Sequence, residues 1–149
     1  MAKENTTKNI MIVGVGGQGT LLTSRILGGI MLDAGYDVKL SEVHGMAQRG
    51  GSVVTFVRYG EEVAEPIVEE GQADVLIAFE KLEALRYSHF LKPDGALIIN
   101  DWRIDPMPVV IGAAQYLPFS QRTVSMPSNS QRCSLPSSAQ SISSTRSSI

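Results

Sequence analysis

The 149-residue sequence contains one cysteine, Cys133, and only two histidines. A single thiol can form neither an intramolecular disulfide nor a four-thiolate iron–sulfur site, so any such cluster must belong to another polypeptide. The two histidines are not accompanied by carboxylates or thiolates at metal-ligand spacing, and no serine–histidine–acid arrangement is present. We therefore predict no catalytic residue and no metal site in this chain.

Long apolar runs and basic clusters are also missing. No stretch approaches the roughly 20 apolar residues that span a membrane, and the N-terminal residues lack the apolar segment of a signal peptide. The formal net charge is −2, and the basic residues are scattered without interleaved aromatic residues. This excludes the electrostatic pattern of a nucleic-acid binder. We expect a cytoplasmic protein with neither nucleic acid nor membrane among its partners.

Composition divides the chain into three parts. With 43% hydrophobic and 19% charged residues, the sequence is typical of one globular domain. From about residue 117 serine dominates, acidic residues are absent and apolar periodicity is lost, which predicts a disordered or frameshifted tail. We therefore predict a polar N-terminus over residues 1–8, an α/β domain over residues 9–116 and a serine-rich tail over residues 117–149.

A glycine cluster is the most informative local feature. It follows a β-branched run at residues 10–13, which predicts a buried strand, and it precedes helical periodicity over residues 20–34. Three glycines have the G-x-G-x-x-G spacing of nucleotide-binding loops, namely Gly14, Gly16 and Gly19. Because backbone N–H groups at a helix start attract anions, the loop predicts a phosphate or other anion site, with a purely structural turn as the alternative.

The remaining sequence alternates strand and helix patterns. In the helix over residues 20–34, Leu22, Ile26 and Ile30 recur at four-residue steps, with Leu27 and Met31 alongside, and predict an apolar face that lies on a sheet. Further strands are predicted at residues 36–41, 52–59, 66–68, 74–80, 96–100 and 109–111, with a helix at residues 81–90. This order predicts an α/β fold with an open, mainly parallel, Rossmann-like sheet that has helices on both faces and is incomplete at its C-terminus.

Residues 42–51 have no sustained period and contain several functional side chains, so they predict a loop with a binding role. Glu42 stands where a dinucleotide-binding fold places the acid that binds the ribose, or it pairs with a nearby basic side chain. His44 could carry a proton near neutral pH, or be a hydrogen-bonded loop residue. Arg49 could bind a carboxylate or phosphate, or be a surface arginine bonded to carbonyl groups. Gln18 offers donors and an acceptor to a ligand, or faces solvent.

Three segments together resemble the gamma domain of 2-oxoacid:ferredoxin oxidoreductases: residues 14–19 (GVGGQG), 41–51 (SEVHGMAQRGG) and 73–78 (ADVLIA). The resemblance is nearest to the indolepyruvate branch of this family and covers residues 8–116. It implies a subunit, inactive alone, of a complex that oxidatively decarboxylates aryl 2-oxo acids such as indolepyruvate to acyl-CoA and CO2. It also implies thiamine diphosphate and iron–sulfur clusters on a large partner subunit, coenzyme A as co-substrate and ferredoxin as the electron acceptor.

The resemblance further implies a ligand- or partner-binding role for the two loops. In the family, the glycine loop presents a backbone surface to the partner or to a phosphate-bearing ligand such as coenzyme A. The residues implied are Gly14, Gly16, Gly17, Gln18, Gly19, Glu42, His44, Gln48, Arg49, Gly50 and Gly51. The alternative that the residues leave open is a free-standing Rossmann-type redox protein that binds NAD(P) or FAD at the same glycine loop.

Overall fold

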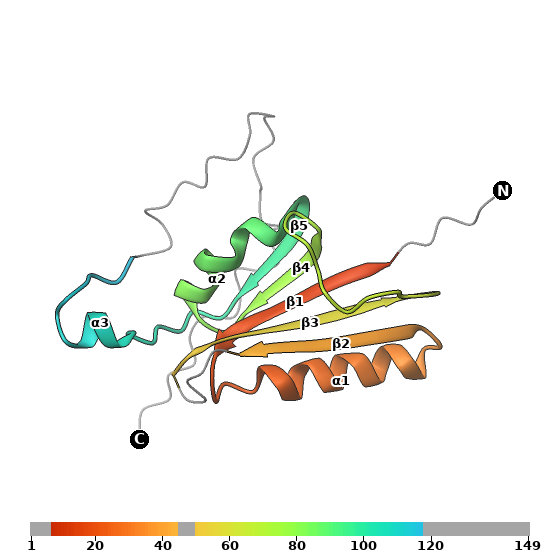
Figure 1. The fold of residues 1–149 in the computed structure, drawn as a ribbon, viewed down its shortest axis with the longest axis horizontal. Helices are drawn as coiled ribbons and strands as arrows, with labels where there is room; N and C mark the ends of the chain where they lie inside the picture. The colour runs from red at the N-terminus through yellow and green to blue at the C-terminus, as the bar shows by residue number, and fades with distance from the viewer. Residues whose placement is uncertain (1–6, 45–49, 118–149) are drawn as a thin grey trace, which may run out of the picture.

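The structure is a computed structural model that describes residues 7–44 and 50–117. Its elements are β1 (Lys8–Val15), α1 (Thr20–Asp33), β2 (Asp37–His44), β3 (Ser52–Gly60), β4 (Ala73–Ala78), α2 (Lys81–Tyr87), the 3-10 helix η1 (Ser88–Phe90), β5 (Leu91–Ile99) and α3 (Met107–Val110). One twisted sheet is flanked by α1 and α2, while the short α3 projects beyond the sheet (Figure 1). The predicted tail falls almost wholly on residues 118–149, which lie outside the described residues.

The five strands form one sheet in the order β2-β3-β1-β4-β5. β1 pairs in parallel with β4, and β4 with β5, whereas β3 runs antiparallel to both β1 and β2. Four strands therefore share one direction, which confirms the α/β fold with an open and mainly parallel sheet. β3 runs antiparallel to β2 because the connection between them is short. A parallel pair needs a crossover of a dozen or more residues, and only residues 45–51 separate β2 from β3.

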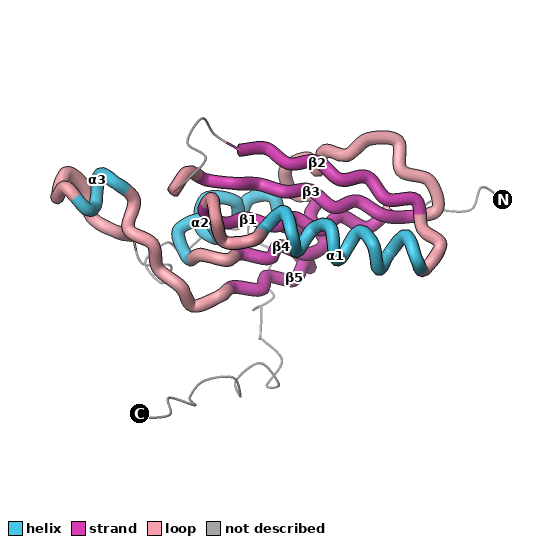
Figure 2. The backbone as a smooth tube through the Cα atoms, turned by 90° about the horizontal axis from the view of Figure 1, so that it is seen from below, coloured by secondary structure: helices cyan, strands magenta, loops and turns pink. Residues whose placement is uncertain are grey.

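The central strand β1 is buried on both sides. Met11 and Val13 pack on one face of the sheet in the cluster that includes α2, whereas Ile10 and Ile12 pack on the other face with Leu27 of α1. The two helices lie on opposite faces of the sheet, as Figures 1 and 2 show. The prediction of helices on both faces is confirmed, and burial of these side chains contributes about 1.5–3 kcal/mol each.

Helix α1 begins and ends close to the predicted positions, but its orientation differs from the prediction. Leu22, Ile26 and Ile30 were predicted to lie on the sheet, and they are instead 64%, 55% and 54% exposed. This prediction is wrong because apolar periodicity identifies a helix face without showing which face touches the sheet. These three side chains point away from the strands, whereas Leu27 packs against Ile10 and Ile12 of the sheet.

Small residues form the face of α1 that packs on the sheet. Thr20, Ser24 and Gly28 are buried at four-residue steps. At Gly28 an added Cβ would lie 3.1 Å from the Leu40 Cδ1 atom of β2. The helix therefore approaches the sheet more closely than a face of large side chains would permit.

Two predicted strands are absent. Residues 66–68 are irregular, and residues 109–111 belong to the end of α3 and the turn that follows it. Pro108 lies in the first turn of α3, where its fixed φ favours a helix start and its missing N–H costs nothing. The prediction of a strand at residues 109–111 is therefore wrong for a local reason.

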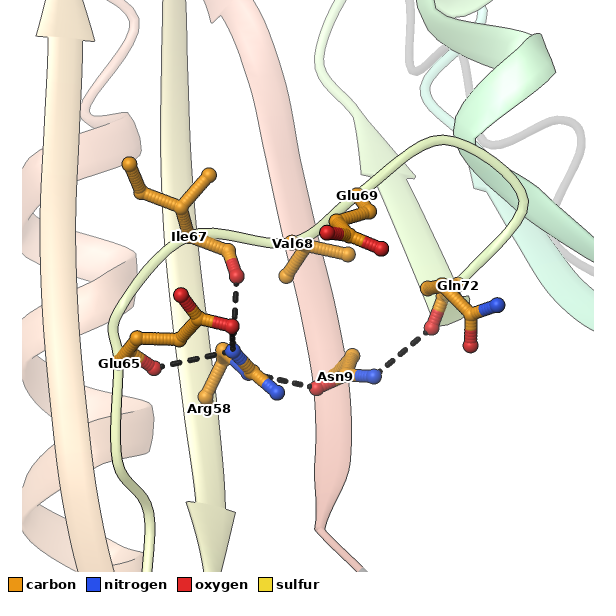
Figure 3. A pocket seen from close by; sticks show the side chains of 7 residues that line it. All are labelled: Asn9, Arg58, Glu65, Ile67, Val68, Glu69 and Gln72. Carbon is orange, nitrogen blue, oxygen red and sulfur yellow. Dashed lines mark hydrogen bonds and ion pairs between the residues drawn. The ribbon is translucent and has the colours of Figure 1, made fainter.

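The connection between β3 and β4 is held by Arg58 instead of by strand pairing (Figure 3). Its guanidinium donates to the Asn9 side-chain oxygen at 2.9 Å and to the carbonyl oxygens of Glu65 and Ile67 at 3.1 and 2.8 Å. These bonds hold the carbonyls of Glu65 and Ile67 against Arg58 of β3, and residues 66–68 form no strand. A pocket of about 180 Å³ remains here, lined by Asn9, Arg58, Glu65, Ile67, Val68, Glu69 and Gln72.

No helix within the described ranges is both long and apolar enough to cross a membrane.

Candidate ligand- and partner-binding site

The two loops predicted to bind a ligand meet at one end of the sheet. The glycine loop follows the carboxyl end of β1, and Gly50 and Gly51 lead into β3, which pairs with β1 up to Val15 and Ser52. The backbone N–H of Gly16 donates to the Gly51 carbonyl oxygen at 2.9 Å. The fold therefore places Gly14, Gly16 and Gly51 in one neighbourhood, at the edge of the sheet where α/β proteins bind ligands.

Gln18 fastens the glycine loop to the next parallel strand. Its side-chain oxygen accepts from the Val15 N–H at 2.7 Å, and its amide nitrogen donates to the Phe79 carbonyl oxygen at 3.2 Å. The amide oxygen and one amide N–H are therefore bonded within the chain. At Gly14 an added Cβ would lie 2.9 Å from that Gln18 oxygen and 3.1 Å from Phe79 Cβ. Glycine is required there for the loop to close.

The other side of the glycine loop is open. Gly17 and Gly19 have φ angles of 98° and 88°, in the left-handed region that favours glycine, and an added Cβ at either would meet no atom of the described residues within 4 Å. Gly19 is the N-cap of α1 and supplies no side-chain cap. The N–H groups of the first helical turn have no intrahelical acceptor, so an anion or a partner's carbonyl groups could satisfy them.

Glu42 does not lie at the ribose position of a dinucleotide site. Glu42 lies on β2 and pairs with Thr55 of β3, and β3 separates β2 from β1. In a dinucleotide-binding fold, the strand before the glycine loop and the strand that ends in the acid are adjacent. Here the corresponding strands, β1 and β2, are two strand spacings apart, about 10 Å. Glu42 therefore does not occupy the geometry that the dinucleotide motif requires.

Part of the second loop cannot be placed. His44 is the last residue of β2, where its backbone pairs opposite Val53, and its side chain lies outside the described residues. Gln48 and Arg49 also lie outside the described residues, in the gap at 45–49. Gly50 is described, with a φ of 76°.

Sequence reasoning missed a buried carboxylate beside the site. Glu80 is 1% exposed and caps α2, since one carboxylate oxygen accepts from the N–H groups of Leu82 and Glu83 at 2.6 and 3.0 Å. The other oxygen accepts from the Ile104 N–H at 3.3 Å and from the Tyr116 hydroxyl. Burial, followed by this bond to Glu80, raises the pKa of Tyr116. Glu80 thereby ties residues 104–116 to the start of α2.

A second buried carboxylate lies under the Gly51 end of the loop. Glu83 is 3% exposed and accepts from Ser52 Oγ at 2.5 Å and from Arg86 Nη1 at 2.9 Å. Ser52 also contacts the Tyr87 hydroxyl at 3.1 Å. Burial raises the pKa of Glu83 above its usual value. Ser52 directly follows Gly51, so its bonds to Glu83 and Tyr87 hold the Gly51 end of the loop against α2. The positions of Glu80 and Glu83, at the N-cap and N3 of α2, are a sequence signal for a helix start but not for burial.

With this geometry in view, comparison with known families decides the assignment. The model of the pyruvate ferredoxin/flavodoxin oxidoreductase family matches residues 9–133. The chain belongs to this family. The match confirms the resemblance to the gamma domain of 2-oxoacid:ferredoxin oxidoreductases that the three sequence motifs indicated.

Individual members of the family agree. Over 108 residues, the chain is 51% identical to the indolepyruvate oxidoreductase subunit IorB of Thermococcus kodakarensis, which covers 72% of this chain and 54% of the relative. The pyruvate oxidoreductase subunit PORC of Thermotoga maritima superposes with a TM-score of 0.53 at 25% identity, over 70% of this chain and 54% of that one. The gamma subunit of a keto/oxoacid ferredoxin oxidoreductase from Geobacter sulfurreducens gives a TM-score of 0.51 at 28% identity, over 62% and 50%.

The chain spans about half the length of the curated relatives that it matches. The family match over residues 9–133 includes the glycine loop, Gly50 and Gly51.

Proposed function

We propose that the chain is a subunit of a ferredoxin-dependent 2-oxoacid oxidoreductase that oxidatively decarboxylates aryl 2-oxo acids, with indolepyruvate as the substrate. The observation that carries the proposal is the junction of the Gly16 and Gly51 loops at the sheet edge, in a chain that is 51% identical to an indolepyruvate oxidoreductase subunit over 108 residues. The products are the acyl-CoA and CO2, and the electrons pass to ferredoxin.

The role proposed for this chain is binding. The open surface over Gly17 and Gly19, together with the uncapped start of α1, suits the phosphate groups of coenzyme A or a segment of the large subunit. Gln18 holds this surface in a fixed shape, since its side chain bonds to the ends of two neighbouring strands. A preformed surface loses little freedom when a ligand binds.

The redox groups are proposed to lie on the large subunit. Within the described ranges, no group of three histidine, cysteine, aspartate or glutamate side chains could hold a metal ion. The chain's one cysteine cannot supply four thiolates. When bound to the partner, thiamine diphosphate supplies the electron sink for decarboxylation, and the iron–sulfur clusters carry the electrons to ferredoxin.

The alternative of a free-standing nucleotide-binding redox protein has less support, because β3 separates Glu42 from the glycine loop and the comparisons do not favour it. Titration of the purified chain with NADH, NADPH and FAD tests it by calorimetry. We expect no binding of these nucleotides, and we expect an affinity-tagged chain to capture a large thiamine- and iron–sulfur-containing subunit from its native extract. Tight binding of a dinucleotide without any such capture would favour the alternative.

A further inference from the structure

The outer face of α1 is apolar and is not covered within the described part of the chain. Leu22, Ile26 and Ile30 follow one another along this face at four-residue steps, each more than half exposed. Figure 2 shows α1 in front of the sheet, on the outside of the described part of the molecule. A continuous row of exposed aliphatic side chains on a packed helix is typical of an interface.

Two consecutive glycines in α1 differ in what the fold requires of them. Gly28 faces the sheet, where an added Cβ would lie 3.1 Å from Leu40 Cδ1. At Gly29 an added Cβ would meet nothing within 4 Å. Glycine weakens a helix relative to alanine, so packing among the described residues gives no reason for glycine at position 29. A glycine on the outer face of a helix does, however, let a second backbone approach closely.

Two charges are placed symmetrically about Gly29. Arg25 precedes it by four residues and Asp33 follows it by four, and both are exposed. Neither side chain makes an ion pair or hydrogen bond with another described residue. At a rise of 1.5 Å per residue they lie about 6 Å on either side of Gly29 along the helix axis.

We propose that two copies of this chain pair through α1, with the helices antiparallel and a two-fold axis at Gly29. This arrangement brings Arg25 of one copy level with Asp33 of the other, and the symmetry makes the contact twice. Ile26 and Ile30 lie on one side of the crossing and interdigitate with the same residues of the second copy. Leu22 closes each end of the contact. The α1 face of each copy is thus buried by the other copy.

The spacing of the charges favours a second copy over an unrelated protein. A different partner would need an apolar strip, but it would not need opposite charges at equal distances from a central glycine. An isologous contact needs this self-complementary arrangement. The proposal does not depend on the oxidoreductase function, because it rests on exposed side chains of α1 and not on the glycine loop.

Charge reversal tests the pairing directly. In Arg25→Asp all four charges at the contact are negative, and in Asp33→Arg all four are positive, so each variant alone should dimerise about tenfold or more weakly than the original chain. An equimolar mixture of the two variants should form a heterodimer in which both charge pairs are restored. The double variant R25D/D33R should likewise recover the homodimer. Sedimentation velocity over a concentration series measures all four samples.

Further variants separate the pairing from misfolding and from other association. Ile26→Glu should abolish the dimer, whereas Asp94→Arg, an exposed charge change on β5, should leave it unchanged. Circular dichroism should show the same helix and strand signal in every sample. The proposal is overturned if the original chain is monomeric throughout, if the reversals or Ile26→Glu leave its dimer intact, or if mixing Arg25→Asp with Asp33→Arg restores nothing. The activity of the chain reconstituted with its large subunit is a separate measurement, and it tests the proposed function.

Discussion

The backbone N–H of Gly16 donates a 2.9 Å hydrogen bond to the carbonyl oxygen of Gly51. This bond joins a strand-to-helix turn to a loop from a different part of the sequence, and it forms where β1 and β3 lie side by side. The order of the strands makes the contact possible, because β3 is inserted between β1 and β2. The same insertion removes Glu42 from the place where a dinucleotide site needs an acid.

The open glycines of the loop can be tested by comparing Gly19→Ala with Gly71→Ala. Both positions have positive φ, 88° and 71°, and neither added Cβ would meet an atom within 4 Å. Each variant should therefore lose a similar amount of stability, about 1–2 kcal/mol. Only Gly19→Ala should also weaken binding of the large subunit or of coenzyme A, as measured by calorimetry. Equal binding by the two variants would mean that the glycine loop contacts neither the large subunit nor coenzyme A.

Gln18→Ala should destabilise the chain without removing any large apolar contact. It leaves the Val15 N–H without this acceptor, which costs about 1–3 kcal/mol, and leaves the Phe79 carbonyl with only the 3.4 Å bond from Asn100 Nδ2. Gln18→Glu keeps an oxygen for the Val15 N–H but sets a second carboxylate oxygen against the Phe79 carbonyl oxygen, so it should destabilise the chain as well. Urea unfolding measures both. If Gln18→Ala unfolds at the same urea concentration as the original chain, the side chain does not bridge the two strands.

Glu83 should make stability depend on pH. Burial raises its pKa in the folded chain, so the folded state binds its proton over a pH range in which the unfolded state has released it. Stability should therefore fall as the pH rises from about 4.5 through the raised pKa. Glu83→Gln should remove this fall while keeping an acceptor for Ser52. Thermal melts of the original chain and of Glu83→Gln between pH 4 and pH 8 measure this difference. The same pH dependence of melting temperature in both would contradict a raised pKa at Glu83.

Tyr116→Phe should release residues 104–116 from α2. The substitution removes the hydroxyl donor to buried Glu80 and should cost about 1–3 kcal/mol. Hydrogen exchange at the Ile104 amide should accelerate, since that N–H bonds the same Glu80 oxygen. Tyr36→Phe, at an exposed ring, is the matched control and should change neither quantity. Unchanged exchange at Ile104 in Tyr116→Phe would show that Glu80 holds this segment without the hydroxyl.

The strands and helices could largely be predicted from local pattern, and their packing could not. The apolar runs at β1 and β4 and the glycine turn before α1 are local signals, and each gives the right element. The buried face of α1 was mispredicted because Thr20, Ser24 and Gly28 contact the sheet, and small residues give no hydrophobic signal.

The site was predicted only where its residues carry a motif. The glycines have a recognisable spacing, so their meeting with Gly51 could be anticipated from the direction of the strands. Glu80 and Glu83 could not be recognised as buried, because their partners Tyr116 and Ser52 are distant in sequence. Burial of a carboxylate depends on such distant donors, and a single sequence does not reveal them.

The central claim is that this chain works only as part of a 2-oxoacid oxidoreductase complex. The direct test is the indolepyruvate- and coenzyme A-dependent reduction of ferredoxin by the purified chain, by the large subunit and by the two together. We expect turnover only from the mixture, and we expect Gly19→Ala to reduce it while Gly71→Ala does not. Turnover by the chain alone at the rate of the mixture, or by the large subunit alone at that rate, would contradict the account.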